Sequence, residues 1–169
     1  KLGPSRQDHR HDRTVTAGPG IRLPELEARL APHGLTLGHQ PQSYEAATLG
    51  GSIAANGAGQ RSDGYGRIAD LLLSAHLETP SGPWTTEALR HAGAGPWLGG
   101  LVTGSEGLFG ILTEATLAVH ALPAESVDEG FLLPDFGAGI EAARIMAQAG
   151  AGLAMLRLSD RAETHFLSV

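Results

Sequence analysis

The sequence predicts an α+β protein in two parts, because segments of strand periodicity and of helical periodicity follow one another along the chain. Residues Ile111 to His120 alternate apolar and polar side chains, as a half-buried strand does. Leucines recur at helical spacing between Leu23 and Leu30. The character of the sequence changes after Pro123, which marks the expected boundary between the parts.

The first part, residues 13–122, is expected to combine several strands with one well-marked helix. That helix should begin near Leu23, because Pro24 suits a first helical turn, and it should stop before Gly34. The turn Pro80–Pro83 should join two of the strands as a hairpin. The expected strands are Arg13–Ala17, Leu35–His39, Leu71–Thr79, Trp84–Thr86 and Ile111–His120.

The second part, residues 123–169, is typical of the start of a split βαβ unit. Its expected elements are a strand at Phe131–Leu133, a helix at Phe136–Gln148, a strand at Leu153–Leu158 and a helix at Ser159–Leu167. Since no closing strand follows, we expect this domain to be incomplete. Residues 1–12 are polar and aperiodic, so we expect an exposed or disordered terminus.

Composition excludes several classes of function. The formal net charge is -6, with only 12 Lys and Arg, so a nucleic-acid partner is not expected. The absence of Cys excludes disulfides, thiolate metal sites and a cysteine nucleophile. No apolar run approaches the roughly 20 residues of a membrane span. The terminus Lys1–Pro4 lacks the pattern of a secretory signal, so the expected location is cytoplasmic.

A His-x-His pair near the N-terminus invites a metal hypothesis. His9 and His11 stand beside Asp8 and Asp12, and all four are residue types that bind metals. A flexible, solvated polar terminus is the better explanation, because no second cluster of ligands is present elsewhere in the sequence. We therefore predict no metal site.

Of the 24 glycines, 11 lie in two segments, Thr48–Gly59 and Gly93–Gly110. Glycine permits positive φ angles and lets the main chain approach a ligand closely, so such segments often bind phosphate-containing cofactors. Tight turns are the alternative explanation.

Three familiar nucleotide and hydrolase motifs are absent. Gly57-Ala58-Gly59 is followed by Ser62 where a dinucleotide fingerprint requires glycine. Lys1 is the only lysine, which excludes a P-loop. Gly104 to Gly107 has the wrong spacing for a hydrolase elbow.

Three segments, in order, carry a specific resemblance. Gly38–Gly51 (GHQPQSYEAATLGG) resembles a flavin-contacting loop, and Tyr65–Leu71 (YGRIADL) resembles the run Tyr-Gly-x-Ile-Glu-Asp-Leu. Gly104–Thr116 (GSEGLFGILTEAT) is similar to the signature Gly-Ser-Glu-Gly-Thr-Leu-Gly-Ile-Ile-Thr-Glu-Ala-Thr. All three resemble segments of the FAD-linked oxidase family, which has the vanillyl-alcohol oxidase fold with its PCMH-type FAD-binding domain.

Within this family the chain most resembles the alkyldihydroxyacetonephosphate synthase branch, with D-lactate and glycolate dehydrogenases next. Leu156–Asp160 (LRLSD) supports that branch, since it resembles the Ile-Arg-Leu-Met-Asp run that opens its substrate domain. The likeness extends from Asp12 to Phe166. It implies the second subdomain of the FAD-binding domain, followed by the start of a ferredoxin-like substrate (cap) domain.

The resemblance implies an FAD-dependent oxidoreductase in which flavin N5 acts on a small hydroxy acid or a substrate of the glycerone-phosphate type. An ether-lipid synthase of the alkylglycerone-phosphate type is the alternative enzyme. A reductase of the enolpyruvyl-sugar type shares the fold but fits the segment Leu153–Asp160 poorly. The implied partner is a small-molecule substrate, and a homodimer stays open.

The family's cofactor residues can be carried over one by one. Those implied to hold the flavin diphosphate and ring edge are Pro41, Gln42, Ser43 and Thr48. Those implied to let the isoalloxazine lie against main chain are Gly50, Gly51, Ala55, Asn56, Gly57 and Ala58. Those implied on the adenosine side are Glu106, Gly107, Gly110, Ile111 and Leu112, the last two through main-chain groups at adenine.

Several positions depart from the family pattern. Gln42 and Ala47 replace Asp and Ser, Leu108 replaces Thr, and Trp97 stands where Asp is common. Each change removes a polar group from the expected cofactor path. A degenerate, non-catalytic flavin fold that serves as a scaffold is therefore a third alternative.

Larger departures concern whole segments of the family. Its pyrophosphate loop, which belongs to the first FAD subdomain, and the later His- and Tyr-bearing segments have no counterpart here. We therefore expect a fragment that is inactive by itself and lacks the first FAD subdomain and the rest of the substrate domain.

Individual polar residues have competing interpretations. Arg157 is the candidate for binding a substrate anion, although a surface ion pair would explain it equally well. His39 could contact the flavin, but a packed histidine is favoured. Glu106 fits a structural or ribose-contacting role better than a catalytic one. Glu114 is expected to face outward, and Tyr65 to pack beside the flavin or in the core.

Overall fold

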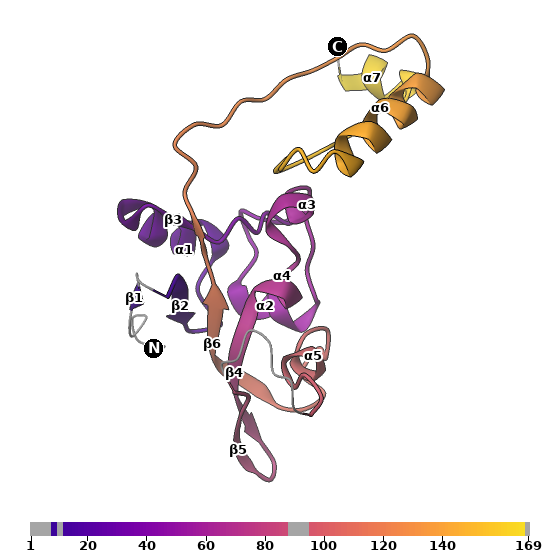
Figure 1. Ribbon diagram of the computed structural model, residues 1–169. Coiled ribbons are helices and arrows are strands. Elements are labelled where there is room, and N and C mark those ends of the chain that lie inside the picture. Colours follow the sequence, from indigo (N-terminus) through magenta and orange to yellow (C-terminus); the bar gives the residue numbers. More distant parts are fainter. Residues whose placement is uncertain (1–7, 10–11, 88–94, 168–169) are drawn as a thin grey trace.

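The first part of the protein is built on a five-stranded antiparallel sheet (Figure 1). The computed structural model describes residues 8–9, 12–87 and 95–167. The strand order is β1-β2-β6-β4-β5, and all neighbouring strands are antiparallel. The strands are β1 Asp8–His9, β2 Thr14–Ala17, β4 Leu72–Thr79, β5 Gly82–Thr85 and β6 Ile111–Ala118.

A second, two-stranded sheet pairs β3 (Leu35–Thr36) with β7 (His120–Ala121). Leu35 lies opposite Ala121 and Thr36 opposite His120. The amide of Leu122 extends this pairing by donating to the carbonyl of Gly34 at 2.7 Å. A strand near the start of the chain is thereby joined to the strand that leads into the second part.

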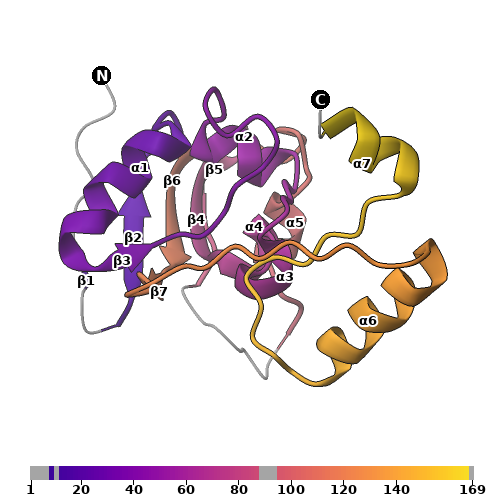
Figure 2. The same cartoon turned by 90° about the horizontal axis from the view of Figure 1, so that it is seen from above.

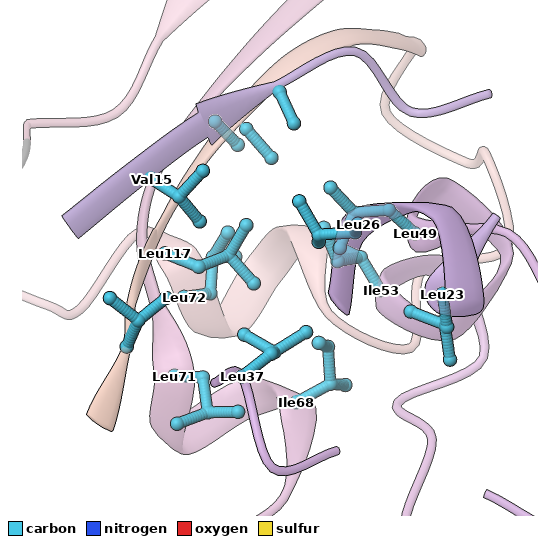
Figure 3. Close-up of a cluster of buried hydrophobic side chains, with 14 of the residues drawn as sticks. Val15, Leu23, Leu26, Leu37, Leu49, Ile53, Ile68, Leu71, Leu72 and Leu117 are labelled. Carbon is cyan, nitrogen blue, oxygen red and sulfur yellow. The ribbon is translucent and has the colours of Figure 1, made fainter. Parts of the chain in front are cut away.

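One face of the large sheet is covered by helices and forms the core (Figure 3). Apolar side chains of α1, α2 and α4 meet those of the sheet in one buried cluster. The most central members include Val15, Leu26, Ile53, Ile68 and Leu117. The helices of the first part are α1 Leu23–Leu30, η1 Ala31–His33, α2 Leu49–Ala54, α3 Ser62–Tyr65, α4 Ile68–Leu71 and α5 Gly99–Val102.

Helix α1 forms as the sequence predicts. Pro24 lies in its first turn, and its three leucines are all buried against the core. A 3-10 turn prolongs it to His33, and Gly34 then adopts a left-handed conformation with φ of 67°. Glycine reaches this conformation without a Cβ penalty, so the helix stops where the sequence indicates.

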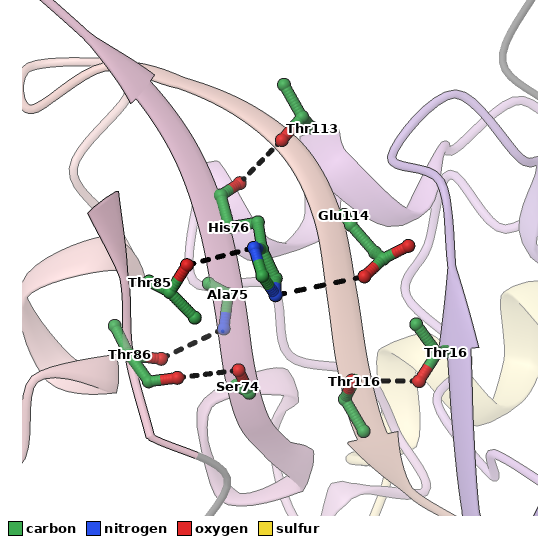
Figure 4. A network of polar contacts seen from close by, with 9 residues as sticks. All are labelled: Thr16, Ser74, Ala75, His76, Thr85, Thr86, Thr113, Glu114 and Thr116. Carbon is green, nitrogen blue, oxygen red and sulfur yellow. Dashed lines mark hydrogen bonds and ion pairs between the residues drawn. The ribbon is translucent and has the colours of Figure 1, made fainter. Parts of the chain in front are cut away.

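The opposite face of the sheet is polar (Figure 4). The hydroxyls of Thr16 and Thr116 lie 2.9 Å apart across β2 and β6. His76 bonds to the hydroxyl of Thr85 at 2.9 Å and lies 3.8 Å from the carboxylate of Glu114. Glu114 therefore does point outward, as expected from the alternation in β6.

The second part holds α6 (Phe136–Gln148) and α7 (Arg161–Leu167), which Figures 1 and 2 place beyond α3, away from the large sheet. Residues 122–135, which lead to it, are exposed and contain neither helix nor strand. Helix α6 has the predicted bounds because Asp135 caps it, accepting from the amide of Ala138 at 2.8 Å.

Two predicted strands of the second part are wrong. Neither Phe131–Leu133 nor Leu153–Leu158 forms a strand. A strand needs a hydrogen-bonding neighbour, and the segments of the described chain that pair are all in the first part. Residues 153–158 instead run along α6 and α3: an added Cβ at Gly139 would lie 2.6 Å from Leu158, and one at Gly64 2.7 Å from Ala154.

The expected exposed or disordered terminus also needs a correction at two residues. Asp8 and His9 pair with Val15 and Thr14 as strand β1, because the chain turns back on itself at residues 12–13. Lys1–Pro4 and His11 lie outside the described residues, as does Gly93 at the start of the second glycine segment. Among the helices that the structure describes, none is both long and apolar enough to cross a membrane.

Candidate functional site

The first glycine segment is held against the turn before α1. Leu49 donates its amide to Ile21 at 2.9 Å, and Gly50 donates to Pro19 at 2.8 Å. A Cβ at Gly50 would lie 2.6 Å from the Pro19 ring, so glycine is needed here for close packing within the chain. Thr48 caps the start of α2 by accepting from the amide of Gly51 at 3.2 Å.

The end of the same segment runs close beside residues 39–41. A Cβ at Gly59 would lie only 1.9 Å from the carbonyl oxygen of Gln40. A Cβ at Gly57 would lie 3.3 Å from Nε2 of His39. The main chain between Ala55 and Gly59 therefore packs closely against the loop that leads to Pro41 and Gln42. Glycine permits this approach because it has no Cβ.

The two glycine segments are joined directly. Gly104 donates its amide to the carbonyl of Ile53 at 3.0 Å, and Glu106 donates to Ala54 at 3.1 Å. An added Cβ at Gly104 would approach Cβ of Asn56 to 3.3 Å. The structure thus brings the end of α2 and the signature loop into one backbone assembly.

Unusual backbone conformations collect at this junction. Asn56 has φ of 50° and Glu106 has φ of 49°, two of the three non-glycine residues with positive φ among those the structure describes. Left-handed conformations of such residues cost free energy and are concentrated at functional sites. The strain supports a functional role for the junction, independently of the sequence resemblance.

Most of the predicted cofactor residues are accessible at or near this junction. The exposed ones are Gln42, Ser43, Gly51, Ala55, Asn56, Ala58, Glu106, Gly107 and Ile111. The half-buried ones are Pro41, Thr48, Gly50, Gly57, Gly110 and Leu112. Bare main chain and short side chains therefore form an open surface along both glycine segments.

The predicted adenosine-side residues divide into two groups. Glu106 and Gly107 lie at the junction, whereas Gly110 lies against the end of β4, where an added Cβ would be 2.5 Å from the carbonyl oxygen of Glu78. Ile111 pairs with Glu78 at the start of β6 and is 74% exposed. Leu108 and Phe109 are exposed beside it, and adjoining exposed apolar residues are typical of a surface that a ligand or another protein covers.

His39 is a packed residue, as the sequence favours. It is 1% exposed, and neither ring nitrogen has a hydrogen-bond partner in the described chain. Burial lowers the pKa of the imidazole below its usual value, because the charged form loses hydration. The ring is therefore neutral at physiological pH and sits directly beneath Gly57.

Arg157 already has a carboxylate partner. Its guanidinium donates to Glu163 in the first turn of α7, and both side chains are exposed. Asp160 fixes that turn by accepting from the amide of Glu163 at 2.8 Å. A substrate anion would have to compete with Glu163 for this guanidinium.

Tyr65 packs within the protein. Its ring lies where a Cβ of Gly38 would be, at 2.4 Å, and it makes an edge-to-face contact with His120 at 5.2 Å between centroids. These contacts agree with packing in the protein, and a position beside the flavin stays a prediction.

One residue at this site escaped the sequence analysis. Glu27 of α1 accepts hydrogen bonds from Thr36, Leu37 and Gly38, immediately before His39. The sequence around Glu27 does not predict these hydrogen bonds, because the donors belong to a different element from α1.

Exposed main chain, small side chains and hydroxyl groups are the kinds of group that a planar dinucleotide cofactor requires, and the two joined segments contain them. No group of three or more candidate metal ligands occurs among the residues described.

Comparisons with known proteins agree with this geometry. Residues 5–86 match the profile of a family described as an FAD binding domain. Alkyldihydroxyacetonephosphate synthase from Dictyostelium discoideum is 38% identical over 156 residues, which cover 92% of this chain and 26% of that protein. Mitochondrial D-lactate dehydrogenase (cytochrome) 1 from Saccharomyces cerevisiae is 35% identical over 119 residues, 69% of this chain and 20% of that protein.

A solved structure of an alkyldihydroxyacetonephosphate synthase superposes with a TM-score of 0.88 at 35% identity, covering 98% of this chain and 31% of that one. The chain thus spans between a fifth and a third of the length of these relatives.

Proposed function

The chain belongs to the FAD-linked oxidase family, and from that premise we propose that it forms part of the cofactor-binding half of an FAD-dependent enzyme. The junction of the two glycine segments carries the proposal. There the amides of Gly104 and Glu106 bond to the end of α2, so that accessible main chain from both segments forms one surface.

Each proposed contact follows from the chemistry of the cofactor. The hydroxyls of Ser43 and Thr48 and the main chain at Pro41 and Gln42 would hold the diphosphate and the ring edge. When bound, FAD would supply a ring system that gains and loses electrons at N5.

Main chain from the two glycine segments would accommodate the rest of the cofactor. Gly50, Gly51 and residues 55–58 would let the flat ring approach the backbone, with the packing of Gly50 against Pro19 fixing that backbone in place. Glu106, Gly107, Gly110, Ile111 and Leu112 would accept the adenosine end. The exposed isoleucine of this group would then be covered.

Two reactions are compatible with this cofactor site. The first is oxidation of a small hydroxy acid or a substrate of the glycerone-phosphate type, with Arg157 binding the substrate anion. The second is formation of an alkyl dihydroxyacetonephosphate, by analogy with the relatives named for it. The second is favoured by identity, because the synthase match is 38% identical and the glycolate oxidase subunit GlcD of Escherichia coli 34%, each over 92% of the chain.

The cofactor proposal is tested on the purified full-length protein. A flavin absorbance band, retained after gel filtration in the presence of added FAD, is the expected result. A colourless protein that gains no band would refute it. Assays for electron-acceptor reduction by hydroxy acids and for the alkylated product then separate the two reactions, since a dehydrogenase must reduce an acceptor stoichiometrically.

A scaffold without cofactor is the remaining alternative, motivated by Gln42, Ala47 and Leu108. Gln42 and Leu108 are exposed, the latter by 80%, so Gln42→Asp and Leu108→Thr can be made without disturbing the core. Ala47 packs against the core, so Ala47→Ser must be controlled for stability. Tight FAD binding by the unmodified protein, with no gain from these changes, would eliminate the scaffold.

A further inference from the structure

Glu27 links helix α1 to the start of the flavin loop through three hydrogen bonds. Its Oε1 accepts from the amides of Leu37 at 2.9 Å and Gly38 at 3.1 Å. Its Oε2 accepts from the hydroxyl of Thr36 at 2.9 Å. Hydrogen bonds to a charged acceptor are stronger than those between neutral groups, so this carboxylate restrains three successive residues.

The restrained residues lie where the chain changes direction. Gly38 has φ of 71°, and its amide is shared between Glu27 and the hydroxyl of Thr36 at 3.0 Å. Its Cα faces the ring of Tyr65, and no side chain could be accommodated there. The direction in which the chain leaves Gly38 therefore depends on the position of Glu27.

The residues after Gly38 belong to the surface to which the proposed cofactor would bind. His39 lies under Gly57, and the carbonyl of Gln40 lies against Gly59, so the path of residues 39–40 also sets the position of the main chain at residues 57–59. A displacement at Gly38 would therefore move both segments of this surface, residues 39–40 and residues 57–59.

The charge of Glu27 also acts on the loop beyond Pro41. Burial raises the pKa of the Tyr44 phenol, and the negative charge of Glu27 is the next largest cause. Tyr44 packs against the core and follows Ser43, so both ends of the segment 38–44 are within reach of this carboxylate.

We infer that Glu27 is a positioning residue for the cofactor: it holds Gly38 so that residues 39–43 and 57–59 form a preorganised FAD-binding surface, without itself contacting FAD. This inference rests on the proposed function and adds to it a residue outside both glycine segments. Preorganisation increases affinity because the ligand does not have to order the loop on binding.

The test compares FAD affinity of the full-length protein with that of Glu27→Ala, Glu27→Gln and the control Glu25→Ala. Glu25 lies on the same helix and pairs with Arg29 in an exposed contact. Loss of two or more charge-assisted bonds should weaken FAD binding about tenfold or more in Glu27→Ala. Glu27→Gln keeps an oxygen acceptor for the two amides and should restore most of the affinity.

Fluorescence of the flavin and its visible circular dichroism provide readouts that a purely structural role would not change. We expect the bound flavin of Glu27→Ala to show altered circular dichroism at saturating FAD, below the melting temperature of the variant. Affinity and dichroism equal to those of the unmodified protein would overturn the inference while leaving the proposed function intact. Absence of FAD binding in the unmodified protein would overturn both.

If Glu27→Ala does not fold, Glu27→Asp replaces it. The shorter side chain keeps the charge but cannot reach both amides from α1, so it should weaken FAD binding in the same direction. Affinity of Glu27→Asp equal to that of Glu25→Ala would then overturn the inference.

Discussion

The amide of Gly104 donates to the carbonyl of Ile53 at 3.0 Å, and this bond joins the signature loop to the end of α2. Gly104 has φ of 76° and lies against Asn56, which is itself left-handed. Together with the bond from Glu106 to Ala54, this hydrogen bond of Gly104 joins two parts of the site that are distant in sequence.

Replacing Gly104 by Ala should both destabilise the protein and weaken FAD binding. The left-handed φ costs about 1–2 kcal/mol for alanine, and the new Cβ would crowd Asn56 at 3.3 Å. Gly34→Ala is the matched control, because Gly34 has φ of 67° with no atom near its Cβ position. Both variants should unfold at lower denaturant concentration, but only Gly104→Ala should lose FAD affinity; equal affinities would contradict this.

Gly59→Ala should displace the flavin loop without any strain in φ. The added Cβ would lie 1.9 Å from the carbonyl oxygen of Gln40, so one of the two backbone segments must move. We expect a loss of stability of about 1–3 kcal/mol, together with weaker FAD binding measured by titration. Gly130→Ala, whose Cβ would meet nothing within 4 Å, should be neutral in both measurements.

His39 should make stability depend on pH. Burial lowers the pKa of the folded-state imidazole below the 6.5 of the unfolded chain. Between these two pKa values the unfolded state binds more protons than the folded state. The contribution of His39 to the free energy of unfolding is therefore complete above pH 6.5, and it is lost as the pH drops towards the folded-state pKa. Denaturation of His39→Leu across this range should show a flatter dependence, and parallel curves would refute the assignment.

Glu163→Gln should strengthen binding of an anionic substrate by Arg157. Removing the carboxylate frees the guanidinium, so KM for the anionic substrate should fall. Because the pair is exposed, the decrease should be at most about fivefold. Glu141→Gln, which releases Arg144 from a similar exposed pair on α6, is the control and should leave KM unchanged. An unchanged KM in Glu163→Gln would leave Arg157 as a surface ion pair only.

Capping residues and the periodicity of apolar side chains predicted those helices and strands that depend mainly on their own sequence. Asp135 caps α6, and the leucines of α1 face the core, so both helices were expected close to their observed bounds. The alternation in residues 111–120 similarly predicted β6 and the outward position of Glu114.

Non-local contacts could not be predicted in this way. The apolar runs at residues 131–133 and 153–158 have strand-like composition, but composition does not provide a partner strand. The role of Gly50 was expected to concern the cofactor, and the structure adds its contact with Pro19. Glu27 was not expected at the site at all, because its partners are known only once α1 and β3 are placed together.

The pairing of β3 with β7 has a mechanical consequence. Thr36, two residues before Gly38, is paired with His120, only a few residues before the exposed stretch that leads to α6. The same four-residue ladder therefore holds the start of the cofactor loop and the start of the exposed residues 122–135, which lead to the second part. We therefore expect a change in the path of residues 122–135 to act on the loop through this pairing, which would couple the two parts of the chain.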